Sequence, residues 1–144
     1  MNGMIATVND ELSRDVSAEA APQSNAFFMM KATALMRDLL PVLDWLGTHK
    51  DFPLTIDAIR SAFELPWLRA LATQHLVLLQ DRRSGEYRRF CVAGEMPFEL
   101  FAPIGEYVAM VPEGDQAERQ HQFLLMCFSA GFTRLRCDIA RWVH

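Results

Sequence analysis

The sequence lacks the short motifs that would assign it to a common enzyme class. It contains no phosphate-binding GxxxxGK[ST] loop, no GxGxxG, no HExxH and no GxSxG. Its four histidines are scattered and have no metal-ligand spacing with any cysteine. We therefore expect no catalytic residues, no metal site and no cofactor in this chain.

Cysteines and long hydrophobic runs are also scarce. The three cysteines include no CxxC pair, and an odd number cannot form a closed disulfide framework, so a reducing compartment is expected. No apolar run approaches the roughly 18 residues of a transmembrane helix. The first twenty residues carry four acids and no long apolar stretch, which is not typical of a signal peptide. These absences favour a cytoplasmic protein.

Lysine is nearly missing, since Lys31 and Lys50 are the only two among 14 basic residues. Against 18 acidic residues the formal net charge is -4, which provides no overall attraction to nucleic acid or to an anionic membrane. Hydrophobic residues, by contrast, make up 51% of the 144 residues. That is enough for a hydrophobic core, and we expect a single folded domain over residues 1–144.

Hydrophobic residues recur at helical spacing over most of the chain. The spacing predicts two long helices, at about 25–48 and 115–143. It also predicts four shorter helices: one at 3–18, one that follows an N-cap at Thr55, one at 66–79 and one within 97–107. Pro66 lies in the first turn of the helix at 66–79. His121 falls on the apolar face of the last helix, where we expect a core histidine bonded to a backbone group. The predicted fold is an all-α helix bundle with one small β-hairpin near 80–92.

Arginines and aromatic rings are concentrated in residues 82–90, RRSGEYRRF. Arginine pairs with phosphates through two hydrogen bonds, and aromatic rings stack on unpaired bases. The segment therefore predicts contact with single-stranded nucleic acid; the alternative is a solvated turn with Asp81 and Glu86 beside it. The candidate nucleic-acid-binding residues are Arg82, Arg83, Tyr87, Arg88, Arg89 and Phe90.

Residues 55–92 also have the order helix, turn, helix and hairpin that is typical of a winged-helix DNA reader. The second of these helices contains no lysine and only Arg69, whereas a recognition helix needs polar side chains that reach base edges. A free-standing winged-helix-like DNA-binding regulator is therefore the alternative interpretation.

Four segments resemble one family of proteins. Residues 31–36 (KATALM), 40–43 (LPVL) and 54–60 (LTIDAIR) look like part of a type IV coupling protein, most similar to the IcmO/DotL and TrbC branch of the TraG/TraD-like ATPases. Residues 120–128 (QHQFLLMCF) resemble the start of a long helix in that branch, QHGY-x-x-MQF, with Gln122 at the position of its glycine.

The resemblance implies that the chain is the all-α domain that such a RecA-like ATPase carries between its nucleotide motifs. The parent protein would then be hexameric, membrane-anchored and active on the cytosolic face of the bacterial inner membrane, and the domain itself would be non-catalytic. The implied partners are a relaxase or an effector protein, with or without single-stranded DNA. Because an inserted domain leaves and re-enters its host, we expect residues 3–18 to pack beside the C-terminal half of the last helix.

Overall fold

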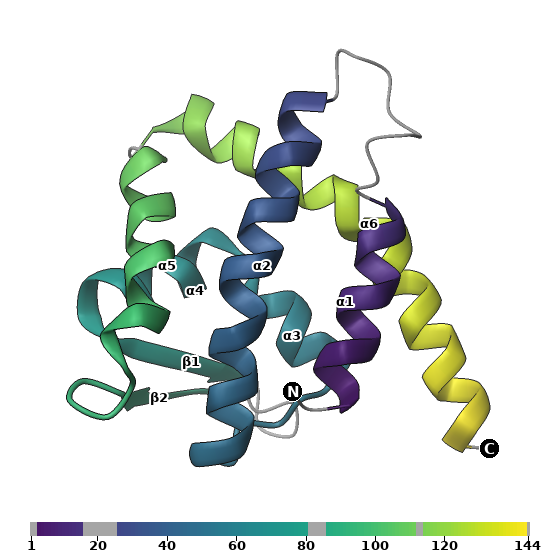
Figure 1. Ribbon diagram of the computed structural model, residues 1–144, viewed down its shortest axis with the longest axis horizontal. Helices are drawn as coiled ribbons and strands as arrows, with labels where there is room; N and C mark the ends of the chain where they lie inside the picture. Colours follow the sequence, from purple (N-terminus) through teal and green to yellow (C-terminus); the bar gives the residue numbers. More distant parts are fainter. Residues whose placement is uncertain (1–2, 16–25, 81–85, 112–113, 144) are drawn as a thin grey trace.

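A computed structural model describes residues 3–15, 26–80, 86–111 and 114–143, with the backbone alone for residues 15, 26–28, 80, 87, 115 and 137–143. These residues form six helices and one two-stranded antiparallel sheet. The predicted all-α bundle with two long helices and one small hairpin is confirmed (Figure 1). In chain order the elements are α1 (Gly3–Asp15), α2 (Ala26–His49), α3 (Ile56–Ala62), α4 (Leu65–Gln74), β1 (Leu76–Gln80), β2 (Tyr87–Cys91), α5 (Phe98–Met110) and α6 (Asp115–Val143).

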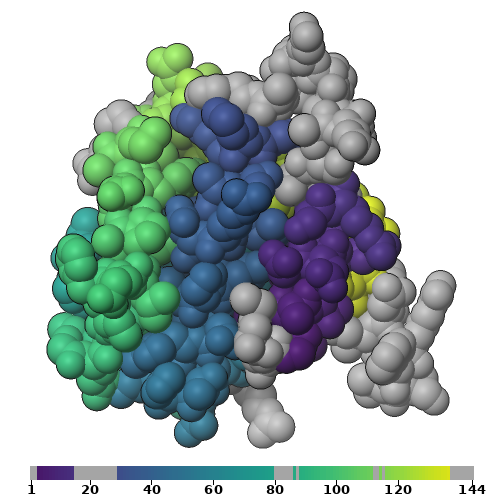
Figure 2. Space-filling view, in the orientation of Figure 1, coloured from purple at the N-terminus to yellow at the C-terminus, as the bar shows by residue number. Residues whose placement is uncertain are grey.

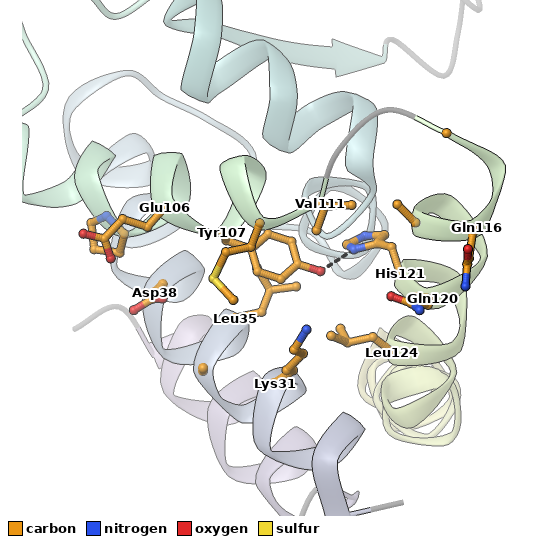
Figure 3. A pocket seen from close by; sticks show the side chains of 15 residues that line it. Lys31, Leu35, Asp38, Glu106, Tyr107, Val111, Gln116, Gln120, His121 and Leu124 are labelled. Atoms are coloured by element: carbon orange, nitrogen blue, oxygen red, sulfur yellow. Dashed lines mark hydrogen bonds between the residues drawn. The ribbon is translucent and has the colours of Figure 1, made fainter.

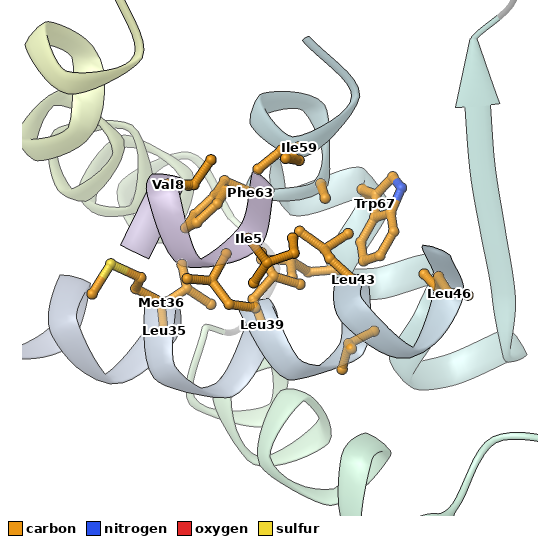
Figure 4. Packing of buried hydrophobic residues seen from close by; sticks show 14 of the residues in the cluster. Ile5, Val8, Leu35, Met36, Leu39, Leu43, Leu46, Ile59, Phe63 and Trp67 are labelled. Carbon is orange, nitrogen blue, oxygen red and sulfur yellow. The ribbon is translucent and has the colours of Figure 1, made fainter. Parts of the chain in front are cut away.

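The long helix α2 runs through the middle of the molecule, and Figure 2 shows it on one face with α1 on one side and α5 on the other. Apolar side chains recur every three or four residues along it, which places them on one face. Leu35, Leu39, Leu43 and Leu46 on this face are fully buried. They belong to one hydrophobic cluster that also contains Ile5 of α1 (Figure 4). The core of the bundle therefore lies beneath α2.

The first helix packs along the C-terminal half of the last one, as predicted (Figure 1). Arg134 of α6 donates to Glu11 of α1, with Nε and Oε1 2.5 Å apart, and Leu135 beside it is buried. Residues 16–18 of the predicted helix lie outside the described residues. Figure 1 also shows the first turn of α1 and the last turn of α6 at the same end of the molecule.

The predicted helix over 66–79 is wrong in its second half. Helix α4 ends at Gln74 because His75 takes a left-handed conformation with φ 52° and ψ 34°, and its N–H closes the helix on the carbonyls of Ala70 and Leu71. The chain then forms β1, which pairs with β2 in the register Leu76 to Cys91 and Gln80 to Tyr87. Strand pairing satisfies the backbone of this apolar segment as fully as a helix would, so the helical spacing of its leucines was misleading.

Two of the helix starts agree with the predicted signals. Thr55 precedes α3, and its Oγ1 accepts a hydrogen bond from the Ala58 N–H at 3.2 Å. Pro66 lies in the first turn of α4, which begins one residue earlier than predicted, at Leu65. Within the described ranges, none of the helices combines the length and the hydrophobicity that crossing a bilayer requires.

Candidate functional site

A cleft of about 570 Å³ lies between α2, α5 and the N-terminal half of α6 (Figure 3). Helix α5 packs against α2 and α4, and α6 packs against α2 and α3. The three walls therefore come from segments that are far apart in the sequence. The side chains that decide its chemistry are Lys31, Leu35 and Asp38 of α2, Glu106, Tyr107 and Met110 of α5, and Gln116, Gln120, His121 and Leu124 of α6.

A buried histidine joins two walls of the cleft to the end of α3. His121 is 2% exposed, and its Nε2 lies 2.9 Å from the Phe63 carbonyl oxygen. A carbonyl only accepts, so Nε2 carries the proton and donates it. The other ring nitrogen, Nδ1, is then an acceptor for the Tyr107 hydroxyl at 2.5 Å. The predicted core histidine with a backbone partner is confirmed.

Both members of this pair are held in their neutral forms. Burial lowers the pKa of His121 below its usual 6.5; the bond to the Phe63 carbonyl opposes this shift, and the positive charge of Arg69 adds to it. Burial also raises the pKa of Tyr107 to about 12. The His121–Tyr107 pair therefore works near neutral pH as a structural link with one fixed tautomer.

Two carboxylates lie at one end of the cleft. Figure 3 shows Asp38 of α2 and Glu106 of α5 together there, whereas Gln116 and Gln120 lie at the other end. Burial raises the pKa of Asp38, and the negative charge of Glu106 raises it further. Among the residues that the structure describes, no lysine or arginine forms an ion pair with either carboxylate. This end of the cleft is therefore acidic, whereas Lys31 lines the cleft between its two ends (Figure 3).

The described part of the arginine-rich segment, residues 86–90, contains most of β2 and contributes no residue to the cleft. Arg88 and Arg89 both lie in β2 and are exposed, but consecutive residues of a strand project from opposite faces. Phe90 is half-buried and packs against the core, which makes it poorly placed to stack on a base. Arg82, Arg83 and the side chain of Tyr87 lie outside the described residues. Of the three candidate residues whose side chains are described, two are thus exposed and one is half-buried, and the three do not share one face of β2.

The helix that would read DNA in a winged-helix protein has little free polar surface. The order α3, α4, β1, β2 is present, but α4 packs against α5. Arg69, its one basic residue, bonds to Glu118 of α6 with Nη1 and Oε1 3.2 Å apart. These contacts occupy the side chain that would have reached a base.

Metal and thiol chemistry find little support in the described part of the chain. There, no group of three or more His, Cys, Asp and Glu side chains is placed to hold a metal ion. Cys91 is a free thiol, Sγ of Cys127 lies 4.0 Å from the Phe123 carbonyl oxygen, and the side chain of Cys137 is not described.

Sequence reasoning missed the cleft and both of its polar pairs, Tyr107 with His121 and Asp38 with Glu106. Local spacing contains no signal for them, because their partners His121 and Asp38 belong to other helices. The one available hint was His121 itself, a polar side chain on an apolar face that requires partners for both ring nitrogens.

Comparison of the chain with protein-family models, with curated proteins and with solved structures gives no significant match.

Proposed function

We propose that the chain is a non-catalytic substrate-recognition domain of a type IV coupling protein, and that it acts in conjugative transfer or type IV secretion. The proposal starts from the resemblance of residues 31–60 and 120–128 to the IcmO/DotL and TrbC branch of these ATPases. It assigns the recognition role to the cleft between α2, α5 and α6.

The observation that carries the proposal is the position of the two resembling segments in the fold. Lys31, Ala34 and Leu35 come from the first segment, and Gln120, His121 and Leu124 come from the second. Although far apart in the sequence, these residues line the same cleft. Two segments that resemble the same family line one concave surface together, and this favours a binding role for that surface.

The arrangement of α1 and α6 supports the second part of the proposal, insertion into a larger ATPase. The two helices pack together, with the first turn of one and the last turn of the other at the same end of the molecule (Figure 1). An insertion needs such neighbouring ends, because its host chain continues from both. We therefore expect the full reading frame to encode a phosphate-binding loop outside these residues.

The cleft can be blocked with a matched pair of substitutions. Ala34 is exposed and lines the cleft, whereas Ala130 is exposed on α6 and does not line it. Ala34→Trp should fill the cleft, and Ala130→Trp adds the same side chain elsewhere. In the host bacterium, transfer of a mobilisable plasmid and export of a reporter-fused effector are measured at equal abundance of the protein.

We expect Ala34→Trp to reduce plasmid transfer or effector export at least tenfold, while Ala130→Trp leaves both unchanged. Deletion of the whole domain should abolish the same process. The proposal fails if deletion of the domain leaves both processes at their original rates.

The isolated chain should neither bind nor hydrolyse ATP. Phosphoryl transfer requires a phosphate cradle and a group that holds Mg²⁺, and the sequence contains no phosphate loop. Release of phosphate from ATP by the purified chain is the measurement. Turnover that a point substitution in this chain abolishes would contradict the expectation.

A further inference from the structure

Within the described residues, neither carboxylate at the acidic end of the cleft forms an ion pair, although Lys31 lines the same cleft. Asp38 and Glu106 come from different helices and lie together at this end (Figure 3). Their mutual repulsion is relieved if a cation enters between them. Two carboxylates are fewer than the three ligands of a candidate metal site, and the described residues contain no such group. An organic cation, an amine or a guanidinium, fits this end better than a metal ion.

Part of the cleft wall offers an apolar surface to the same ligand, whereas Lys31, Gln116 and Gln120 make the remainder polar. Met110 lines the cleft and is 67% exposed, and methionine adapts its shape to apolar partners. Ala34, Val111 and Ala117 also line the cleft. A volume of about 570 Å³ holds several side chains, and falls within the range of ligand pockets.

We propose that the cleft binds a segment of a partner protein in which a basic side chain lies between Asp38 and Glu106 and a neighbouring apolar side chain packs on Met110. That this partner is the exported substrate rests on the proposed function. The recognition chemistry itself depends only on the cleft.

Short synthetic peptides test the proposal in solution. The probe is acetyl-Leu-Arg-Leu-amide, and its matched control is acetyl-Leu-citrulline-Leu-amide, in which citrulline keeps the shape of arginine without the charge. Each peptide is titrated into the ¹⁵N-labelled full chain, and backbone amide shifts are followed by NMR. We expect saturable shifts at residues of the cleft with the arginine peptide, and at least tenfold weaker binding of the citrulline peptide.

Carboxylate substitutions locate the binding site. The Asp38→Asn/Glu106→Gln double variant should bind the arginine peptide about tenfold more weakly, because two partly exposed ion pairs are lost. Glu99→Gln is the control, since Glu99 lies on α5, is exposed and does not line the cleft. Unchanged spectra outside the cleft show that each variant is folded. Binding of the arginine peptide with equal affinity to the parent and to the double variant overturns the proposal, as does the absence of saturable shifts.

Two further titrations distinguish a basic protein segment from other cations as the ligand of the cleft. If Mg²⁺ or spermidine alone reproduces the shifts at the same affinity, the cleft is a general cation site and the proposal is wrong.

The result of the peptide titrations is also independent of the transfer assay. If the peptide binds but deletion of the domain affects neither transfer nor export, the proposed binding chemistry of the cleft is supported and the proposed function is wrong. If deletion of the domain abolishes transfer but the peptide does not bind, the proposed function is supported and the proposed binding chemistry of the cleft is wrong.

Discussion

Beneath α2 the helices are held by side chains without polar atoms, whereas beneath the cleft α5, α6 and the end of α3 are joined through the ring of His121. In the first region Leu39 and Leu43 are fully buried among other apolar residues. In the second, two hydrogen bonds, to Phe63 and to Tyr107, satisfy a buried imidazole.

This difference separates two sources of stability. The apolar region gains free energy in proportion to the surface that it removes from water, and it has no titratable group. The His121 junction gains little net free energy from its hydrogen bonds but loses much if one partner is removed, because the other stays buried and unpaired. The junction should therefore respond to pH and to single-atom changes that leave the apolar core unaffected.

Truncation in the apolar region should have the largest effect. Phe128 is 1% exposed, and its ring lies 5.1 Å from that of Phe63 between ring centroids. Phe128→Ala should lower the free energy of unfolding by about 3–5 kcal/mol, the usual range for emptying a buried aromatic site. Urea denaturation followed by circular dichroism measures this loss.

The same helix supplies the control for this prediction. Phe123 is 59% exposed, so Phe123→Ala should change the free energy of unfolding by about 0.5 kcal/mol or less. Equal losses at the two positions would mean that the buried face of α6 has been assigned wrongly.

Removal of one oxygen atom from the junction should have the next largest effect. Tyr107→Phe keeps the ring but leaves Nδ1 of His121 without a hydrogen-bond donor. A buried unsatisfied acceptor costs about 1–3 kcal/mol, and denaturation in urea at neutral pH measures it. The His121→Phe/Tyr107→Phe double variant, which has no unpaired group at this pair of positions, should lose less than the sum of the two single changes. Additive losses would show that the hydroxyl and the ring do not interact.

Acidification should weaken the junction and leave the apolar region unchanged. The pKa of His121 is lower in the folded chain than its usual 6.5, so the unfolded chain binds a proton first as pH falls. The stability that this group contributes is present above pH 6.5, and it is lost as pH falls through the folded-state pKa. Melting temperatures between about pH 8 and pH 5, above most of the carboxylate range, should therefore fall with pH for the parent chain.

The pH dependence has its own control in a side chain that does not titrate. His121→Gln retains one donor and one acceptor, and its melting temperature should vary less over this range. A parent chain and a His121→Gln variant with identical pH profiles would contradict the role given to the histidine.

Asp38 acts in the opposite direction at lower pH. Its pKa is raised in the folded chain, so protonation of Asp38 stabilises the folded state. Asp38→Asn should therefore be neutral or stabilising near pH 7.

The two regions also differ in how far the sequence could predict them. The period of Leu35, Leu39 and Leu43 identifies a buried helical face without any knowledge of its neighbours, and α2 follows it. The cleft depends instead on contacts between helices. No local spacing links Tyr107 to His121 or Asp38 to Glu106, so these pairs appear only once α2, α5 and α6 are assembled.

The end of α4 illustrates the same limit within a single segment. Leu68, Leu71 and Leu79 continue a helical spacing through His75, although the chain leaves the helix there and pairs as β1 with β2. The choice between helix and strand for residues 76–80 depends on the partner strand at 87–91, and a local period cannot contain that information.

The hairpin should show the smallest effects of all. Arg88 and Arg89 are exposed, so replacing both with alanine should change the free energy of unfolding by less than about 0.5 kcal/mol for each residue. Their predicted role is in contact with single-stranded DNA, together with Arg82 and Arg83. Each phosphate contact contributes about -0.7 to the slope of log affinity against log salt, so four arginines allow a slope of at most about -3. Binding should be weak, because the net charge of -4 opposes it.

Fluorescence anisotropy with a labelled oligonucleotide at several salt concentrations measures this slope. The Arg88→Ala/Arg89→Ala variant should lose about 1.4 of it, two contacts at about 0.7 each. Arg37→Ala/Arg119→Ala removes the same charge from exposed positions on α2 and α6, and should change the slope little, because distant charges are screened at these salt concentrations. If both double variants behave alike, or if the parent chain does not bind at low salt, the hairpin arginines form a solvated surface. The proposed recognition would then rest on the cleft, where Asp38 and Glu106 would favour a basic protein segment over a DNA strand.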